Sequence, residues 1–171
     1  GVFEFIGAAR NLKAKYPNAR FLLLGAIDAA NRTAVDARTV ARWEEEGIIE
    51  YHGNKHDVRP YIRAAHCVVL PSYREGAPRS LIEAAAMARP LIATDVPGCR
   101  SVVADGETGY LCKARDSEDL ARKMEAFLAL PKEHMARMGR AGRVKMVKNF
   151  DDSIVIEAYR NVIASLPSLS R

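Results

Sequence analysis

Two glutamates, Glu75 and Glu83, are the residues of this sequence best placed to do chemistry. Glu75 comes just before the turn residues Gly76 and Pro78, and Glu83 lies eight positions after Glu75, within the apolar run "SLIEAAAMA". We expect this run to form a largely buried helix, and a buried ionised carboxylate needs hydrogen-bond donors from the protein or from a ligand. The alternatives are a structural pairing of Glu83 with an arginine or a helix end, and a solvated loop charge at Glu75.

The elements around the two carboxylates indicate what they could bind. The strand predicted before Glu75 ends at Leu70, and Pro78 suits the first helical position because its missing N–H would be unpaired there. Free N–H groups and the helix dipole at such a helix start favour an anion. Side chains on a helix lean toward its N-terminus, so Glu83 should point to the same place. A nucleotide-sugar, with hydroxyl groups on both sides of a phosphate, fits this arrangement.

Short apolar runs that alternate with helical patterns predict the fold. The runs are bounded by Gly, Pro or Asp and cover residues 19–25, 48–53, 66–71, 90–95 and 109–113. Helical patterns cover residues 1–16, 36–46, 57–65 and 78–88, and after Asp116 they continue through 117–130, 132–150 and 151–166. Continuous apolar strands are typical of a parallel sheet buried on both faces. We therefore predict an α/β fold, a Rossmann-like doubly wound parallel sheet with a helical C-terminal tail and ligands at the carboxyl ends of its strands. Residues 30–38 are the most loop-like stretch.

Composition limits the possible classes of protein. With 171 residues, of which 49% are hydrophobic and 27% charged, the chain should form one domain over residues 1–171. The net charge of +5 favours anionic partners. Three cysteines without metal-ligand spacing indicate reduced thiols and a cytoplasmic protein. No apolar run approaches the roughly 18 residues that span a membrane, and no signal peptide is visible. The basic run over residues 132–148 is either a solvated helix face or a peripheral contact with an anionic membrane.

The stretch "PSYREGAPRSLIEAAAMARPLIATDVPGCRSVVADGETGYL" resembles the E-x7-E region of retaining family-4 glycosyltransferases of GT-B architecture. The segments "VVLPS", "PLIATDVPG" and "DGETGYL" occur around the two glutamates in the family's order. The resemblance covers nearly the whole chain, as the C-terminal, nucleotide-sugar-binding domain. The segments "PSYREG" and "TDVPGCR" are similar to transferases that build capsule, O-antigen or glycoprotein oligosaccharides on lipid carriers, commonly from UDP-sugars.

This resemblance implies a role for each matching residue. Glu75, the catalytic candidate, would accept hydrogen bonds from the donor sugar, and Glu83 from the ribose. Backbone N–H groups would meet the sugar and the diphosphate, and the base would lie near Gly25 and Gly53. The predicted donor site consists of Gly25, Gly53, Glu75, Gly76, Ala77, Pro78, Arg79, Ser80 and Glu83. The resemblance further implies transfer to a saccharide or lipid-linked acceptor with retention at the anomeric carbon, and no metal or other cofactor.

The sequence departs from the family pattern in two ways. An Arg and a Lys that hold the diphosphate usually come just before the stretch where this chain begins at Gly1, and the N-terminal acceptor domain is missing as well. We therefore expect a fragment that binds donor weakly and transfers little, and whose last helix, 151–166, lacks part of its native partner. Arg89 stands where the family usually has Gly, so it must either take a positive φ or end its helix in another way.

Other classes of protein lack their signatures here. A nicotinamide-dependent enzyme would need G-x-G-x-x-G after the first strand, where only Gly25 occurs, and G-x-S-x-G of the α/β-hydrolases is absent from the sequence. The four histidines have no H-x-x-x-H spacing, which argues against a metal site. Aromatic residues make up 7%, too few for a nucleic-acid partner. A nucleotide-sugar epimerase of the same architecture and a non-catalytic nucleotide-binding module remain as alternatives.

Overall fold

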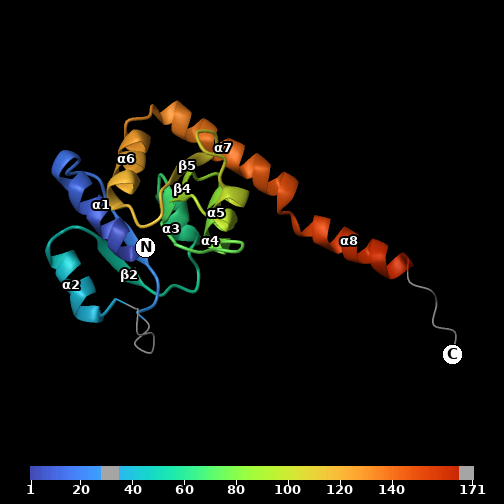
Figure 1. The fold of residues 1–171 in the computed structure, drawn as a ribbon, viewed down its shortest axis with the longest axis horizontal. Coiled ribbons are helices and arrows are strands. Elements are labelled where there is room, and N and C mark those ends of the chain that lie inside the picture. Colours follow the sequence, from blue (N-terminus) through green and yellow to red (C-terminus); the bar gives the residue numbers. More distant parts are fainter. Residues whose placement is uncertain (28–34, 166–171) are drawn as a thin grey trace.

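The computed structural model describes residues 1–27 and 35–165, in which helices and strands alternate before three helices follow in succession (Figure 1). The elements are α1 (Val2–Lys15), β1 (Leu22–Leu24), α2 (Ala37–Glu45), β2 (Glu50–Gly53), α3 (Arg59–Ala64), β3 (Val68–Leu70), α4 (Arg79–Ala86), β4 (Leu91–Thr94), α5 (Pro97–Val102), β5 (Gly109–Cys112), α6 (Ser117–Leu128), α7 (Lys132–Asn149) and α8 (Asp152–Ser165). Residues 30–34 of the stretch predicted to be loop-like lie outside the described residues. The order of elements confirms the predicted α/β class with its helical C-terminal part.

Strand pairing in the described residues is parallel, as the continuous apolar runs predicted. β1 pairs with β2, while β3, β4 and β5 form a second ladder in that order. Within each ladder the carboxyl ends of the strands lie at one edge, so the loops that follow them are neighbours. The strands are shorter than predicted: the run over 66–71, for example, contributes only Val68–Leu70.

The ladder of β3, β4 and β5 is buried on both faces, because successive side chains point to opposite sides of a sheet. Val69, Ile92 and Cys112 face one hydrophobic core, to which α1 and α6 contribute. Leu91 and Ala93 face a second core, built with α4 and α5. Helices therefore cover both faces, and Figure 1 shows α1 and α6 on one side of β4 and β5 with α4 and α5 on the other. This is the layered arrangement of a doubly wound fold.

The end of α4 follows the second of the two predicted alternatives, since Arg89 does not take a positive φ. The positive φ of +56° falls on Ala88. The Ala88 N–H donates to the carbonyl of Ala85, and the Arg89 N–H donates to that of Ala84, both at 2.9 Å. These two bonds form the Schellman pattern, in which a residue of left-handed conformation closes the helix. Arg143 of α7 donates a further hydrogen bond to the last turn of α4, where a cation is favoured by the helix dipole.

Helix α5 was not predicted. Its six residues begin with Pro97 and Gly98, a pair more typical of a turn. Proline suits the first helical position, where no N–H is needed. The helix buries Cys99 and Val102 in the second core and brings Gly98 next to the loop that carries Glu75.

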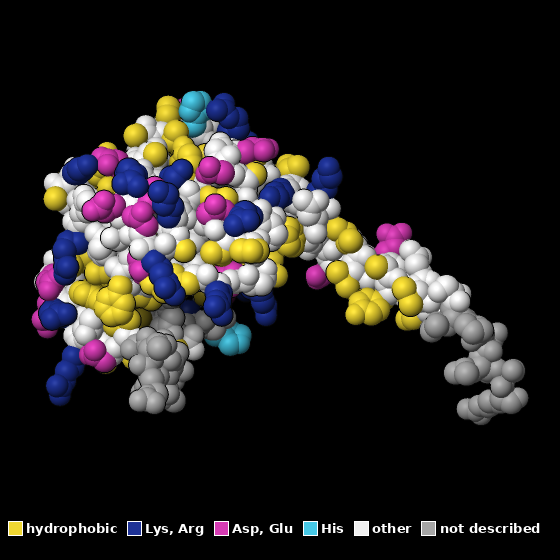
Figure 2. All heavy atoms as spheres, in the orientation of Figure 1, with side chains coloured by type: hydrophobic (Ala, Val, Ile, Leu, Met, Phe, Trp, Pro, Cys, Tyr) yellow, Lys and Arg dark blue, Asp and Glu magenta, His cyan; other side chains and the backbone are white. Residues whose placement is uncertain are grey.

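Helix α8 projects away from the rest of the domain (Figure 1), and none of its residues is buried. Its apolar side chains are 44% to 67% exposed, and Figure 2 shows hydrophobic side chains gathered along it. The residues concerned are Ile154, Val155, Ile156, Tyr159, Val162 and Ile163. Among the described residues, no helix combines the length and the apolar character needed to cross a bilayer.

Candidate functional site

The loop between β3 and α4, residues 71–78, carries Glu75 and is fixed from the side of β4 and α5. The buried Thr94, at the end of β4, donates a hydrogen bond from its hydroxyl to the carbonyl of Ser72. A Cβ atom at Gly98 would lie 2.2 Å from the carbonyl oxygen of Glu75 and 2.5 Å from that of Gly76. Only glycine allows so close an approach of two backbones. The main chain at Glu75 is therefore held in place by the neighbouring strand and helix.

The start of α4 offers free backbone donors. Pro78 is the N-cap and not the first helical residue, so α4 begins one residue later than predicted. Arg79 and Ser80 form the start of its first turn. No side chain of the described residues caps this end. Since the N–H groups of a first helical turn have no partner within the helix, those of Arg79 and Ser80 can bind an anion. Gly76, Ala77, Arg79 and Ser80 are all exposed, so a ligand can reach them.

Glu83 is not buried, contrary to the prediction. Its side chain is 44% exposed and pairs with Arg79 at 3.6 Å between Oε1 and the guanidinium nitrogen. Leu81, Ala84 and Ala85 form the buried face of α4, and helical geometry puts Glu83 on the opposite side. The contact with Arg79, in the first turn, confirms that Glu83 points toward the start of the helix. Its carboxylate can therefore accept hydrogen bonds from a ligand at this end.

Glu75 is half-buried and lies near the thiol of Cys99. Burial raises the pKa of this thiol, and the negative charge of Glu75 contributes to the increase. A thiol held in its neutral form is a poor nucleophile. Cys99 is therefore not a candidate nucleophile, and Glu75 remains the candidate group in the loop that leads into α4.

Gly25 and Gly53 are brought together at the carboxyl ends of β1 and β2. The Gly25 N–H donates to the Gly53 carbonyl at 3.0 Å, and the Tyr51 hydroxyl donates to the Gly25 carbonyl at 2.8 Å. Both glycines have positive φ, +147° and +67°, values that other residues adopt only with strain. The two predicted base-binding glycines therefore form one compact corner. They belong to the ladder of β1 and β2, while Glu75 and the start of α4 follow the ladder of β3, β4 and β5.

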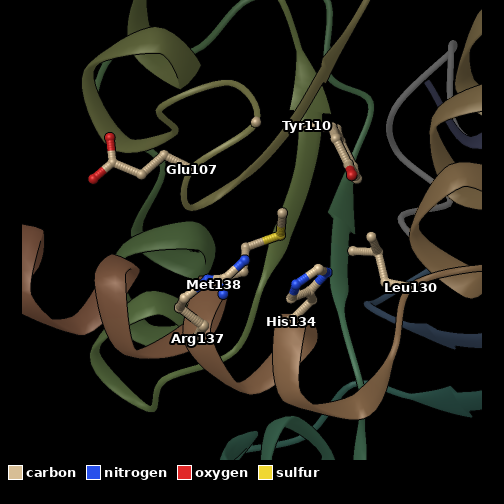
Figure 3. Close-up of a pocket in the computed structure, with 7 residues that line it drawn as sticks. Glu107, Tyr110, Leu130, His134, Arg137 and Met138 are labelled. Carbon is tan, nitrogen blue, oxygen red and sulfur yellow. The ribbon is translucent and has the colours of Figure 1, made fainter.

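A hollow of about 110 Å³ lies elsewhere (Figure 3). It is lined by Gly106, Glu107, Tyr110, Leu130, His134, Arg137 and Met138. Gly106 and Glu107 precede β5, so the hollow lies at the amino end of this strand, away from the edge that carries Glu75. Sites for small molecules usually measure about 300–1,000 Å³. The hollow is too small for a nucleotide-sugar, and none of the predicted site residues lines it.

Side chains that could ligate a metal are scattered over the described part of the chain. There, no group of three or more His, Cys, Asp or Glu side chains is arranged to hold a metal ion. The positive charge available to a diphosphate at the start of α4 comes from the helix end and from Arg79. A reaction without a metal stays a prediction.

Thr94 and Gly98 support the site, although no role was predicted for either. Both lie in the segment "PLIATDVPG", which contributed only to the family resemblance. The Pro-Gly pair after a predicted strand could have indicated a close backbone contact, since glycine in such a place often allows one. The partner of that contact, Glu75, could not be found from spacing alone.

The fold and the site define a doubly wound α/β domain with two carboxylates at an uncapped helix start. Residues 1–145 match the family model described as "Glycosyl transferases group 1". The chain therefore belongs to the group 1 glycosyl transferases.

Known proteins with similar sequence or structure include several glycosyltransferases. The N,N'-diacetylbacillosaminyl-diphospho-undecaprenol alpha-1,3-N-acetylgalactosaminyltransferase of Campylobacter jejuni is 28% identical over 159 residues, which are 93% of this chain and 40% of that protein. The structure of a sucrose-phosphate synthase from Thermosynechococcus elongatus is 27% identical in sequence and has a TM-score of 0.78; the match covers 95% of this chain and 43% of the synthase. The structure of Anabaena Alr3699/HepE in complex with UDP is 20% identical in sequence and has a TM-score of 0.84; the match covers 97% of this chain and 45% of that protein. The chain thus spans less than half the length of these proteins.

Proposed function

We propose that this chain is the donor-binding domain of a retaining glycosyltransferase that uses a UDP-sugar. The observation that carries the proposal is the uncapped start of α4 at the carboxyl edge of a parallel sheet, with Glu75 in the loop that leads into it and Glu83 directed toward it from the second turn. Doubly wound sheets bind their ligands at this edge. The similar Anabaena protein is in complex with UDP, which supports the choice of nucleotide.

In this proposal each group has one task. Glu83 accepts hydrogen bonds from the ribose hydroxyls, and Glu75 accepts them from the donor sugar. The N–H groups of Arg79 and Ser80 bind the diphosphate, whose negative charge increases as the bond to the anomeric carbon breaks. Fixed donors directed at a developing charge lower the barrier, because they need no reorganisation during the reaction. These donors and the Arg79 guanidinium carry the diphosphate charge, so we propose transfer without a metal, with retention of configuration.

A second domain would complete the site. Gly76, Ala77, Arg79 and Ser80 are exposed, whereas ligand sites usually bury most of the ligand surface. The chain also spans only 40% of the Campylobacter transferase. We propose that an N-terminal domain of the same polypeptide closes over the donor and binds a saccharide or lipid-linked acceptor. The lipid-linked choice rests on the name of that relative.

The basic face of α7 is the part of the domain that could contact a membrane in the cytoplasm. Arg137, Arg140 and Lys148 are exposed, which suits either an anionic membrane surface or solvent. On the face seen in Figure 2, Lys and Arg side chains are interspersed with Asp and Glu. Peripheral membrane contact is therefore a separate part of the proposal, and binding of the full-length protein to anionic vesicles tests it.

The experiment that tests the proposal is thermal unfolding of the full-length protein with a panel of nucleotides. A ligand that binds only the folded state raises the melting temperature. We expect UDP and UDP-sugars to raise it and NAD to leave it unchanged. Incubation of the best UDP-sugar without acceptor separates the alternatives, because an epimerase would convert that sugar to its isomer and a non-catalytic module would leave it unchanged with or without acceptor. No shift with any UDP compound would refute the proposal.

A further inference from the structure

Tyr73 connects the loop that carries Glu75 to helix α1. Its hydroxyl donates a hydrogen bond to Oε1 of Glu4 at 2.5 Å, across 69 positions of sequence. The side chain of Glu4 is only 16% exposed, and its other oxygen, Oε2, faces the nitrogen of Gly1 at 3.9 Å. Hydrogen bonds to charged groups are stronger than those between neutral groups. The contact with Glu4 also raises the pKa of the Tyr73 phenol, which keeps its donor proton in place.

The ring of Tyr73 is covered by a cation from a third element. The guanidinium carbon of Arg115, just before α6, lies 4.8 Å from the ring centroid. Arg115 has a φ of +60°, an unfavourable left-handed conformation for a residue with a side chain. Backbone strain of this kind persists where the surroundings hold it and is common at functional sites. A glycine would relieve the strain, but it would remove the guanidinium from Tyr73.

These contacts hold the loop from the side opposite to β4 and α5. Thr94 and Gly98 fix Ser72 and the Glu75 main chain from one side. On the other side, α1 and α6 pack against each other, so Glu4 of α1 and Arg115, two residues before α6, approach Tyr73 from a packed pair of helices. Tyr73 is the side chain through which Glu4 and Arg115 contact the loop, whose first residue, Pro71, also lies against Gly1 at the start of α1.

We propose that Tyr73, held by Glu4 and Arg115, is a positioning residue that fixes the Glu75 loop for sugar transfer. The inference rests on the proposed function, since it assigns Tyr73 to the reaction in which Glu75 binds the donor sugar. A displacement of about 1 Å at a reacting group can cost on the order of 100-fold in rate. The positioning network therefore acts on turnover, while nucleotide affinity depends on the separate contacts of Glu83 and α4.

Kinetics of single variants in the full-length protein test this division. Tyr73→Phe keeps the ring and removes the hydroxyl, so we expect kcat to fall by about tenfold or more, the effect of losing a hydrogen bond to a charged group, with UDP affinity unchanged. Glu4→Gln keeps an acceptor for Tyr73 and should retain activity, whereas Glu4→Ala should lose as much as Tyr73→Phe. Tyr16→Phe is the matched control, because the Tyr16 hydroxyl contacts the Glu125 carboxylate at 3.4 Å, at the other end of α1. It should leave kcat unchanged.

Two further measurements separate positioning from a general effect on folding. The double variant Tyr73→Phe with Glu4→Ala should lose no more activity than either single variant, since the two residues share one contact. Arg115→Gly should lower kcat while the melting temperature stays equal or rises, because the left-handed strain is relieved. A structural role alone would lower stability and activity together. Arg115→Gly also keeps the test decisive if Tyr73→Phe folds poorly.

Amide hydrogen exchange without ligand distinguishes failure of this inference from failure of the proposed function. Tyr73→Phe should speed exchange at residues 72–77 relative to the unsubstituted protein, whatever the substrate is. Unchanged exchange there, or losses of activity that multiply in the double variant, would overturn the positioning role. If the loop responds as expected but the unsubstituted protein binds no UDP compound, the network stands as a loop anchor and the proposed function is overturned.

Discussion

Replacing Glu83 with glutamine should separate nucleotide binding from fold stability. The ion pair with Arg79 joins side chains that are 44% and 89% exposed, at 3.6 Å. Pairs so exposed contribute little, so the free energy of unfolding should change by less than about 0.5 kcal/mol. A ribose hydroxyl that loses its charged acceptor should weaken UDP binding by about 1–3 kcal/mol, which corresponds to a roughly 5- to 150-fold higher Kd.

A competing effect must be smaller than this loss. Removing the charge of Glu83 also removes its repulsion of the diphosphate, which is about 1 kcal/mol for each phosphate charge at 4 Å in water and falls below that at the greater distance imposed by the ribose between them. The net change should therefore stay a loss of affinity. Calorimetric titration of UDP into the full-length variant measures it. Glu46→Gln is the control for losing a surface carboxylate away from α4, because Glu46 is 40% exposed and pairs with Arg42 at 3.8 Å and with Arg10 at 2.5 Å. Equal UDP affinity in both variants would remove Glu83 from the site.

Three further predictions concern the sugar contact, the end of α4 and the last helix. Glu75→Ala should lower turnover far more than affinity for free UDP, because sugar contacts strengthen as charge develops at the anomeric carbon. Steady-state kinetics and UDP titration measure the two losses, and equal losses would contradict this role. Ala88→Gly should stabilise the protein by about 1 kcal/mol in chemical denaturation, since it relieves the φ of +56°. Ala86→Gly, at the last residue of α4, relieves no such strain and should destabilise the protein; a change of the same sign in both variants would contradict this. Residues 151–166 should exchange amide hydrogens faster in the isolated chain than in the full-length protein, because α8 has no buried residue here; equal strong protection in both would show that the helix belongs to this domain alone.

Most of the fold could be predicted because its signals are local. Apolar runs such as residues 90–95 are continuous where a strand is buried on both faces, and β4 is fully buried as expected. The apolar residues of α1, α4 and the C-terminal helices recur at helical spacing, which is also a local signal, so these helices could be predicted. The strand ends were less accurate, since an apolar residue such as Ala19 extends the predicted run although β1 begins only at Leu22.

The errors concern properties, such as burial and long-range contacts, that depend on the position of a residue in space and not on its neighbours in the sequence. Glu83 was predicted to be buried because its sequence neighbours are apolar, but only every third or fourth residue of a helix shares a face. For the end of α4 the sequence left open whether Arg89 takes a positive φ, and spacing could not show that Ala88, one residue earlier, does so instead. The contact of Tyr73 with Glu4 joins residues 69 positions apart and leaves no trace in spacing or periodicity. The glutamates could be found from the sequence, whereas the contacts that hold the Glu75 loop could not.

The central claim is that a UDP-sugar binds across the start of α4 and the corner formed by Gly25 and Gly53. Amide hydrogen exchange of the full-length protein, with and without UDP, tests it most directly, because bound amides are protected in proportion to the stabilisation of the folded state around them. The account predicts slower exchange at residues 76–83 and 51–54 when UDP is present. Protection confined to the hollow lined by Tyr110 and His134, or no protection at any of these places, would contradict it.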